Sequence, residues 1–348
     1  MPPHRLFGTD TMASVNHRSL APLLILGWTM PAALAETHRV IGETYYHTFS
    51  AAHPVLARVK SGDTIVTKTV DSAGFDYQGV RRTKTHGNPL TGAFYVEGAE
   101  PGDALAVRIV RLRMNRSTGY TGSQVGIARV PEELKAAKPK LNAVYEGYDT
   151  LTPWTIDLAR KTVRNGALEF AARPMLGCIG VAPQGDFSPR SGPAGYWGGN
   201  LDFNLIGEGA TVYLPVFHPG ALLFFGDGHA LQGDGEAIGS GVETSLDVEV
   251  EVVLRKRWKL SGPRVETAAE IVSVGAIPDG PTLNAAMELA TVDMLQWLVE
   301  NYGRTPTEAH LLVGMQARYN IITLGGAVGL RIPKNALQQK TKGASARP

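Results

Sequence analysis

The sequence has a single cysteine, few charged residues and no run of basic residues. Cys178 is the only cysteine among 348 residues, which excludes an internal disulfide and any zinc or redox site of the Cys-x-x-Cys type. Charged residues make up 19% of the chain, and 34 Lys and Arg balance 32 Asp and Glu. Without a basic patch to release counterions, the chain is not expected to bind nucleic acid. A chain of this length can form a core without a disulfide or a structural metal.

Several familiar catalytic motifs are also absent. The sequence contains no HExxH zinc motif, no EF-hand loop, no phosphate-binding P-loop and no GxSxG nucleophile elbow. It also lacks the paired HxH histidines of a cupin. These absences exclude the corresponding metal sites and nucleophiles.

Glycine and proline, in contrast, are abundant, and 40 Gly with 22 Pro is typical of a β protein with many turns. Five segments have the composition or alternation of strands: 63–70, 104–112, 210–217, 222–225 and 244–254. The last has apolar side chains on one face and acidic side chains on the other, which predicts a half-buried antiparallel strand. Residues 222–225 are apolar on both faces, which predicts a central strand.

After Lys259 the apolar period changes from two residues to 3.6. An apolar stripe from Leu283 to Leu298 predicts a helix that Gly303 ends, and a capping box at 305–308 begins a second helix towards Tyr319. The sequence therefore predicts a mainly β fold, with a β-sandwich or barrel-like core of antiparallel strands (about 55–260) and a C-terminal helical hairpin (about 282–320). Residues 36–333 are expected to form one domain, followed by a flexible basic tail at 334–348.

The first 35 residues have the pattern of a secretory signal peptide. A polar, mildly basic start precedes the apolar residues 20–34, and Ala33-Leu34-Ala35 offers a cleavage site. The apolar stretch is too short to span a bilayer, so no membrane span is predicted. Met12 is a more natural start than Met1. We expect a secreted or periplasmic protein after cleavage near Ala35.

The densest polar segment is 226–236, directly after the apolar strand at 222–225. It contains four titratable residues and one amide, namely Asp227, His229, Gln232, Asp234 and Glu236. Carboxylates with an imidazole suit Zn²⁺ or a similar divalent cation, and the interspersed glycines let the backbone approach it. From these residues alone, a metal or catalytic site and a solvated acidic loop are equally good interpretations.

Other polar positions are weaker candidates when each is considered alone. Gly199-Asn200 and Asp202 form a sequence that is more often an Asx-turn than a ligand, and His53 before Pro54 is more simply structural. Asp71 ends a strand, and Glu97 precedes a glycine. Cys178 has apolar neighbours and no nearby base, which predicts an inert buried thiol rather than a nucleophile.

Three segments resemble motifs of the acetamidase/formamidase family of metal-dependent amide hydrolases. They are residues 95–103 (YVEGAEPGD), 198–202 (GGNLD) and 228–236 (GHALQGDGE). Residues 177–183 and 58–63, the latter leading to Asp71, add weaker support. The resemblance extends from about Val55 to Tyr319.

The resemblance implies a β-sandwich core and hydrolysis of a small linear or cyclic amide to carboxylate and ammonia or amine. It also implies a divalent cation, with zinc favoured over calcium, bound by Asp71, Asp202 and His229, and less firmly by His53. Glu236 would shuttle the proton, and we expect Asp234 to orient His229 or a water. The expected substrate-binding residues are Gly199, Asn200, Gln232 and Glu97.

We expect a homo-oligomer whose only other partner is a small amide substrate. The alternative from another class is a secreted β-sandwich binding protein in which His229, Asp202 and Asp227 hold a Ca²⁺ or Zn²⁺ that only braces loops. A closed, fully liganded ion would favour that alternative, and an open position facing a pocket would favour hydrolysis.

Overall fold

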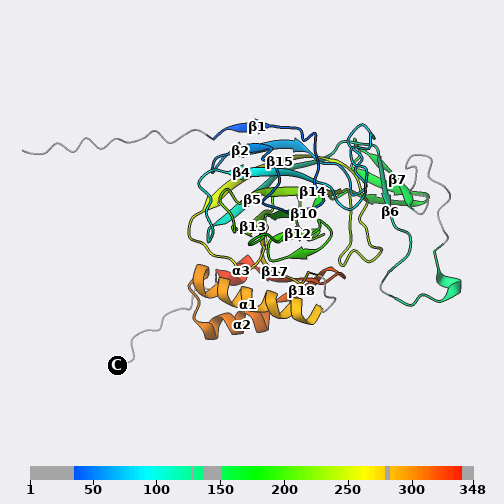
Figure 1. Ribbon diagram of the computed structural model, residues 1–348. Helices are drawn as coiled ribbons and strands as arrows, with labels where there is room; N and C mark the ends of the chain where they lie inside the picture. The colour runs from blue at the N-terminus through cyan, green and yellow to red at the C-terminus, as the bar shows by residue number, and fades with distance from the viewer. Residues whose placement is uncertain (1–34, 127, 137–150, 279–282, 339–348) are drawn as a thin grey trace, which may run out of the picture. The chain divides into compact units, whose positions relative to one another are not determined.

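The computed structural model describes residues 35–126, 128–136, 151–278 and 283–338 (Figure 1). The predicted signal peptide lies outside the described residues, except for Ala35. Most of the predicted C-terminal tail also lies outside them, but its first residues form a short helix, α3 (Lys334–Leu337), in which Ala336 and Leu337 are buried.

The largest element is a nine-stranded sheet that is antiparallel except for its first pair. In spatial order its strands are β1 (Thr37–Arg39), β3 (Thr64–Lys68), β15 (Leu246–Arg255), β5 (Ala104–Met114), β13 (Thr211–Pro215), β16 (Arg264–Glu266), β17 (Glu270–Ala276), β19 (Ala327–Pro333) and β18 (Arg318–Thr323). The predicted alternation in β15 is confirmed, because its apolar residues are buried and its acidic residues are half-buried on the opposite face.

A second sheet of six strands contributes most of the polar residues of interest. Its order is β11 (Ala194–Gly195), β12 (Gly198–Asn200), β10 (Met175–Val181), β14 (Leu223–His229), β4 (Leu90–Val96) and β2 (Ala57–Val59). The predicted central strand is β14, which lies between β10 and β4. A smaller sheet consists of β6 (Thr118–Thr121), β7 (Thr152–Asp157), β8 (Thr162–Asn165) and β9 (Leu168–Ala171), and a 3₁₀ turn, η1, spans Glu132–Leu134.

The main core lies between the nine-stranded and six-stranded sheets. Strand β5 shows how the sequence builds the layers, since Leu105 and Val107 belong to this core, whereas Ala104 and Ala106 face the opposite side. The six-stranded sheet contributes stacked aromatic rings, with the Phe94 and Phe225 centroids 5.3 Å apart. Alternation with a period of two thus lets one strand serve two apolar layers.

The second apolar layer is formed by the two predicted helices, α1 (Leu283–Tyr302) and α2 (Pro306–Gln316). Helix α1 packs on β17 and β19, and α2 packs on α1 (Figure 1). The predicted capping box is present, because Thr305 accepts a hydrogen bond from the Glu308 backbone and the Glu308 side chain accepts one from Thr305. The fold class is therefore confirmed as mainly β with a C-terminal helical hairpin.

The structure differs from the sequence-based expectation after Lys259. Strands β16, β17, β18 and β19 were not predicted, and the second helix ends at Gln316 rather than continuing to Tyr319. Every residue of β17 is buried, so the strand has no polar face and no alternation to detect. Both large sheets also remain open, and no barrel closes within the residues that the structure describes.

A buried ion pair joins the nine-stranded sheet to α1. Arg264 of β16 donates to Asp293 of α1 from Nε at 2.8 Å and from Nη2 at 3.0 Å, and Ser261 donates to the same carboxylate. Both charged side chains are buried. Breaking a pair of this kind leaves an uncompensated charge inside the protein.

We therefore expect Asp293→Ala to lower the free energy of unfolding by about 3–5 kcal/mol. Urea denaturation would measure the change. Glu208→Ala is the control, since its ion pair with Arg113 is exposed and should contribute at most about 1 kcal/mol. Equal effects of the two substitutions would contradict the prediction.

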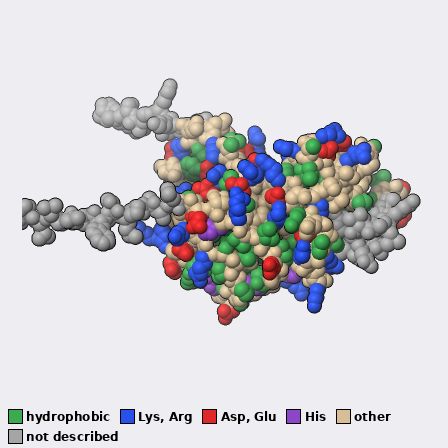
Figure 2. Space-filling model, turned by 90° about the horizontal axis from the view of Figure 1, so that it is seen from above, with side chains coloured by type: hydrophobic (Ala, Val, Ile, Leu, Met, Phe, Trp, Pro, Cys, Tyr) green, Lys and Arg blue, Asp and Glu red, His purple; other side chains and the backbone are tan. Residues whose placement is uncertain are grey.

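The surface is mixed in charge. Lys and Arg side chains are interspersed with Asp and Glu on the face seen from above in Figure 2. Among the described residues, no helix combines the length and apolarity that a membrane-spanning segment needs.

Candidate active site

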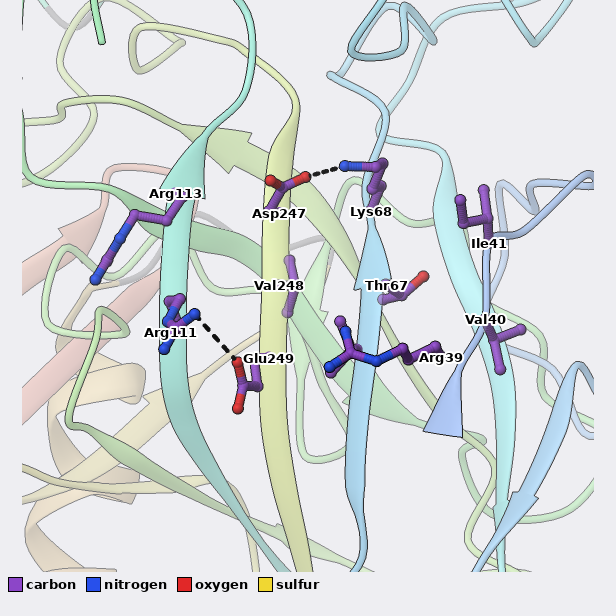
Figure 3. Close-up of a pocket in the computed structure, with 11 residues that line it drawn as sticks. Arg39, Val40, Ile41, Thr67, Lys68, Arg111, Arg113, Asp247, Val248 and Glu249 are labelled. Carbon is purple, nitrogen blue, oxygen red and sulfur yellow. Dashed lines mark hydrogen bonds and ion pairs between the residues drawn. The ribbon is translucent and has the colours of Figure 1, made fainter. Parts of the chain in front are cut away.

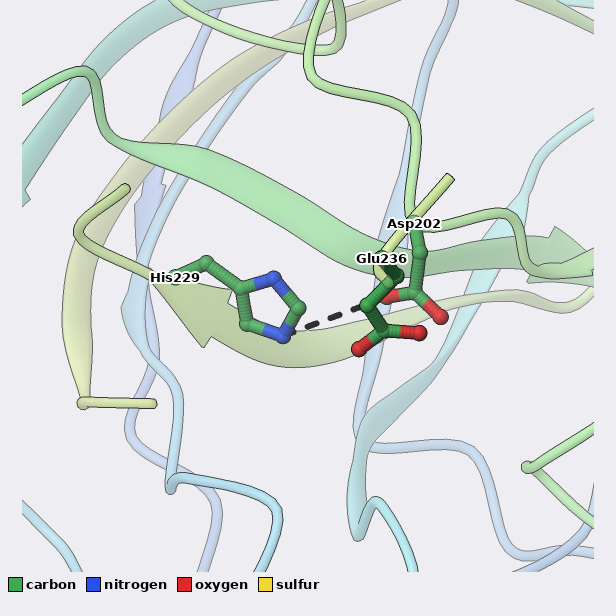
Figure 4. Close-up of side chains that lie close together, drawn as sticks. All are labelled: Asp202, His229 and Glu236. Atoms are coloured by element: carbon green, nitrogen blue, oxygen red, sulfur yellow. Dashed lines mark ion pairs between the residues drawn. The ribbon is translucent and has the colours of Figure 1, made fainter. Parts of the chain in front are cut away.

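Five titratable side chains converge beside the ends of β12 and β14. We call them the carboxylate–histidine cluster: Asp202, Asp227, His229, Glu236 and Glu243. Asp227 and His229 belong to β14, Asp202 follows β12, and Glu236 lies in the loop after β14. Glu243 is the antiparallel bridge partner of His229. Figure 4 shows the imidazole of His229 facing the carboxylates of Asp202 and Glu236.

Three carboxylates surround Nε2 of His229. Its distances are 3.2 Å to Glu243 Oε1, 3.5 Å to Asp227 Oδ1 and 3.9 Å to Asp202 Oδ1. Ligand atoms about 2.0–2.1 Å from a tetrahedral zinc are separated by roughly 3.3 Å. The cluster therefore has the dimensions of a cation site.

Gln232 fixes the orientation of the His229 ring. Its Nε2 donates a hydrogen bond to the Asp202 carbonyl at 2.6 Å, and because a carbonyl can only accept, Oε1 must face the histidine. His229 Nδ1 lies 2.7 Å from that oxygen and donates to it. In the neutral ring this leaves the lone pair of Nε2 directed at the carboxylates, which is the tautomer that binds a metal.

Four buried atoms of the cluster have no hydrogen-bond partner: Asp202 Oδ1, Asp227 Oδ1, His229 Nε2 and Glu243 Oε2. The residues that carry them are at most 3% exposed. Burying a polar atom without a hydrogen-bond partner costs about 1–3 kcal/mol or more, and burying an unpaired ionised group costs more still. Carboxylate and imidazole atoms that are buried together without a hydrogen-bond partner fit a divalent cation, so these residues suit the group that the resemblance implies.

The backbone is strained at three residues of the cluster. Asp202, Asp227 and Glu236 have φ values of 47°, 56° and 49°, in the left-handed region that L-residues rarely adopt. Such strain persists only where the surrounding structure holds it, and it concentrates at functional sites. Here it occurs just after β12, within β14 and in the loop that follows β14, and the carboxylate at each of these points belongs to the cluster.

Glycine at two neighbouring positions leaves room for the cluster. A Cβ at Gly177 of β10 would lie 2.6 Å from Asp202 Oδ1 and 2.7 Å from Asp227 Oδ2. A Cβ at Gly241 would collide with the ring of His229. Both positions therefore require the absence of a side chain for the carboxylates and imidazole to approach one another.

The crowding of negative charge shifts the ionisation of the cluster. Burial, followed by the charge of Asp227, raises the pKa of Glu243 to about 8 despite the opposing effect of His229. Burial also raises the pKa values of Asp202 and Glu236. Burial alone would lower the pKa of His229, but the carboxylates of Glu243 and Asp227 raise it above its usual value.

These shifts predict how the metal-free protein responds to pH. Glu243 releases its proton near pH 8 in the folded state but near pH 4.3 in the unfolded chain, and the raised pKa of His229 acts in the same direction. Because the folded state then binds more protons, its free energy of unfolding should fall as pH rises from about 5 to 8. Urea denaturation of chelated protein would measure this, and Glu243→Gln should flatten the slope. Stability that rises over this range would contradict the assignment.

The cluster opens into a pocket of about 230 Å³. Asp227, Glu236 and Glu243 form its acidic side, and the hydroxyls of Ser72 and Tyr120, 2.8 Å apart, lie on another wall. Pockets for drug-sized ligands have volumes of about 300–1,000 Å³, so this one suits a smaller molecule.

A chain of amides connects the pocket wall to Asp202. Asn200 donates from Nδ2 to Asp202 Oδ2, so its Oδ1 faces away and accepts from Asn88 Nδ2 at 3.0 Å and from the Cys178 thiol at 2.9 Å. Because the carboxylate can only accept, it fixes the direction of every bond in the chain. One oxygen of Asp202 is thereby restrained, and the other stays directed at His229.

A larger pocket, of about 520 Å³, lies on the outer face of the nine-stranded sheet (Figure 3). Two ion pairs lie within it, Lys68 with Asp247 and Arg111 with Glu249, and Arg113 pairs with Glu208 outside it. No residue of the carboxylate–histidine cluster lines it. We therefore assign the candidate site to the smaller, acidic pocket.

Comparison with known proteins gives the same family as the motifs. The sequence model of the acetamidase/formamidase family matches residues 188–317. A crystal structure of a predicted acetamidase/formamidase from Thermoanaerobacter tengcongensis has a TM-score of 0.73 and 29% identity, covering 88% of this chain and 98% of that one. The crystal structure of an acetamidase from Bacillus halodurans has a TM-score of 0.72 and 28% identity, covering 85% of this chain and 97% of that one. The resemblance to the acetamidase/formamidase family is confirmed.

One related sequence aligns over a shorter stretch. A Schizosaccharomyces pombe protein described as a candidate formamidase is 28% identical over 53% of this chain. The alignment covers 57% of that relative, so the chain spans little more than half of its length.

Two metal ligands that the family resemblance implied lie outside the cluster. Asp71 accepts hydrogen bonds from the backbones of Ala73 and Phe75, and its other oxygen accepts one from Arg116 at 2.6 Å. An arginine already neutralises this carboxylate, so it braces the loop that carries Ser72. His53 stacks on Tyr46 with centroids 3.9 Å apart and uses Nε2 to contact Thr48. Neither side chain joins the groups that could hold a cation.

Four other expected site residues do not line the pocket. Asp234 is exposed, and its two oxygens accept from the amides of Asn204 and Asn320, so it anchors the loop to β18 rather than orienting His229. Glu97 is exposed beyond the far end of β4, whose opposite end, Leu90, pairs with Gly226 near the site. Gly199 pairs with its neighbours inside the sheet, and Gln232 is buried behind His229, whereas Asn200 does line the pocket.

Asp227 was predicted only as part of the polar segment 226–236 and as a ligand in the binding-protein alternative, and Glu243 was not predicted as a site residue. Glu243 reaches the cluster because its backbone and that of Tyr120 exchange hydrogen bonds and because it bridges to His229. The one available signal was the pair of strands that flank the glycine-rich segment after His229. These strands belong to different sheets, so a simple hairpin could not be assumed.

Proposed function

We propose that this protein hydrolyses the C–N bond of a small amide to a carboxylate and ammonia, with water activated at a divalent cation. The observation that carries the proposal is the set of four unpartnered, buried atoms of the cluster, two of whose residues, Asp227 and Glu243, line a small acidic pocket. The similarity to the acetamidase/formamidase family supports amide hydrolysis in general terms.

The ligand set we propose is Asp202, Asp227, His229 and Glu243, in place of the one that the resemblance implied. Imidazole and carboxylate donors favour zinc, and calcium, which prefers oxygen ligands, is the alternative. A bound divalent cation would polarise the amide carbonyl and activate water for attack.

Glu236 is the residue we assign to proton transfer. It lines the pocket beside Asp227, its side chain is only partly buried, and burial raises its pKa above the usual value of a glutamate. A carboxyl group with a raised pKa can accept a proton from water and deliver it to the departing nitrogen near neutral pH. The backbone holds it in place, because Gly235 exchanges hydrogen bonds with Ile322 and Leu324 at the end of β18.

Other pocket residues position the substrate. The Tyr120 hydroxyl accepts a hydrogen bond from the Ala73 backbone and pairs with the Ser72 hydroxyl, which holds two hydroxyl groups at the wall. Hydroxyls of this kind can bind an amide oxygen. The volume of about 230 Å³ is compatible with a formamide- or acetamide-like substrate and with a small lactam.

The competing functions have less support. Burial, with the charges of Asp227 and Asp202, raises the pKa of Cys178 well above the usual value of a thiol, so Cys178 is not a thiolate nucleophile at neutral pH. A cation that only braces loops is the other alternative. It would not require a pocket that reaches three of the acidic side chains, as this one does.

The proposal is tested by metal analysis combined with an ammonia-release assay on formamide, acetamide and a γ-lactam. We expect a bound divalent metal, loss of turnover after chelation and recovery when the metal is restored. His229→Gln should lose both metal and activity, whereas Cys178→Ser should retain both. Turnover that survives complete removal of metal would refute the mechanism, and tightly bound metal without turnover of any amide would favour the binding protein. Residues 1–35 lead us to propose that the enzyme is exported.

A further inference from the structure

The backbone of Glu36 is bound to the nine-stranded sheet through both of its polar groups. Its nitrogen donates a hydrogen bond to Oδ1 of Asp63 at 2.9 Å, and Asp63 is only 2% exposed. Its carbonyl accepts a hydrogen bond from the Thr64 backbone at 2.8 Å, directly before the parallel pairing of β1 with β3 begins. Glu36 is therefore held in place although the residue itself is exposed.

The same residue follows the cleavage site that the sequence predicts. Ala33-Leu34-Ala35 places the expected cut between Ala35 and Glu36. Hydrolysis of this peptide bond by a signal peptidase consumes one water and leaves a carboxylate on Ala35 and an α-ammonium group on Glu36. The nitrogen that becomes the ammonium is the one that donates to Asp63.

The Asp63 carboxylate pairs with no lysine or arginine side chain in the described part of the chain. Its Oδ2 accepts from the Lys60 backbone at 2.8 Å and lies 2.7 Å from Nε2 of His38, which is charged only when protonated. Burial alone would raise the pKa of Asp63, but hydrogen bonds from Lys60, Glu36 and His38 lower it. Asp63 is thus a buried anion, and a cationic partner would strengthen its hydrogen bonds.

A second turn of the same kind has such a partner. Residues 60–63 and 100–103 both precede a strand, and their glycines have φ values of 98° and 92°. In each turn the aspartate accepts a hydrogen bond from the backbone of the first residue, at 2.8 and 2.9 Å. Asp103 also pairs with the ammonium group of Lys256 at 2.6 Å. In the uncleaved chain, Asp63 lacks the corresponding ammonium.

We propose that Asp63 is the binding site for the N-terminus of the processed protein, the α-ammonium group of Glu36. We call this pair the N-terminal anchor. Cleavage converts a neutral hydrogen bond into a charge-assisted one, which is about twice as strong. Ala35 and Glu36 are both exposed, so water can reach the other two N–H groups of the ammonium.

The anchor holds a part of the sheet that has little apolar support. Strand β1 has three residues, none of which is fully buried. Chain ends of this kind fray unless they are tied down. In the processed chain, the ion pair would fix the first residue itself. The inference rests on the proposed export but does not depend on amide hydrolysis.

The test begins with export of the full chain from a bacterial host and mass measurement of the intact secreted protein. We expect the processed chain to begin at Glu36. A second chain carries a Gly-Ser insertion between Ala35 and Glu36, so that cleavage after Ala35 leaves an ordinary amide at Glu36 and moves the ammonium away. We expect the Tm of this chain to be about 2–4 °C lower than that of the wild type.

Substitution of the two aspartates locates the effect. Asp63→Asn should remove the Tm difference between the two chains, because asparagine carries no charge. Asp103→Asn is the matched control, since its turn is equivalent but its cation is Lys256. It should lower the Tm of both chains equally and preserve their difference.

Acylation of the α-amine at pH 7 needs no substitution at Asp63. An ammonium paired with a carboxylate loses its proton less readily, so the wild type should react several-fold more slowly than the chain with the insertion. The measurement remains decisive if Asp63→Asn does not fold.

The outcomes separate the anchor from the other proposals. A secreted protein that retains residues 1–35 would overturn both the cleavage and the anchor. A processed chain that begins elsewhere, equal Tm values, equal acylation rates or a Tm difference that persists in Asp63→Asn would overturn the anchor alone. Ammonia release measures the proposed activity independently of all these results.

Discussion

Replacing Glu236 with Gln is expected to lower kcat for amide hydrolysis by about 10²–10⁴-fold, the usual contribution of a positioned general base. Glutamine has nearly the same shape but cannot accept a proton from water. The substitution leaves the four buried ligand atoms of Asp202, Asp227, His229 and Glu243 in place. Bound metal should therefore remain close to the wild-type amount. Steady-state ammonia release together with elemental analysis would measure both quantities.

Asp234→Asn is the matched control for this experiment. Asp234 lies two residues from Glu236 in the same loop, but it is exposed and its carboxylate binds two asparagine amides. We expect its kcat to stay within a few-fold of the wild type, since only the anchoring of the loop changes. An Asp234→Asn enzyme that is as inactive as Glu236→Gln would show that the loop, and not the acid–base group, controls turnover.

Gly177→Ala is expected to abolish or severely weaken metal binding without touching any proposed ligand. The added methyl group would lie 2.6 Å from Asp202 Oδ1 and 2.7 Å from Asp227 Oδ2, closer than carbon and oxygen can approach. Both carboxylates must then move, although they come from different segments of the chain. Displacing residues that merely orient ligands costs about 10–100-fold in metal affinity, so moving two ligands should cost at least that much. Competition with a chromogenic chelator would measure the affinity.

Gly314→Ala serves as the control for the added methyl group. Gly314 lies in α2 with open space around its Cβ position, and alanine there should stabilise the helix by up to about 1 kcal/mol. Its metal affinity should equal that of the wild type. If Gly177→Ala also binds metal normally, the two carboxylates do not share a cation.

Local patterns in the sequence were sufficient for much of the fold. The turns expected from the abundance of glycine are present, and Gly62, Gly102 and Gly220 adopt positive φ values, which glycine accepts without strain. The Thr305 capping box and the alternation of β15 were equally readable. Each depends on contacts within a few residues or on which face meets the core. Strand β17 was missed because burial on both sides removes that pattern, and β19 is likewise buried at five of its seven residues.

The candidate site was only partly accessible from the sequence. The segment with His229 and Glu236 stands out because polar residues and glycines follow a buried strand. Asp71 stood out for the same reason, but no local feature shows that Arg116, 45 residues later, occupies its carboxylate. Glu243 had no distinguishing neighbours at all. Ion pairs form between groups that are close in space, and the separation of two residues along the chain does not show whether they are close in the fold.

The sequence by itself determined the mainly β architecture, the helical hairpin and the family resemblance, because strand alternation, helix capping and short motifs are local properties. The tertiary structure alone decided which acids share one environment. It brought Asp227 and Glu243 to Nε2 of His229, left Asp71 with an arginine, and turned Asp234 outward. Asp227 and Glu243 are buried and each has one oxygen without a hydrogen-bond partner, whereas Asp71 pairs with Arg116 and Asp234 is exposed. That property exists only once sheets from distant parts of the chain have packed together.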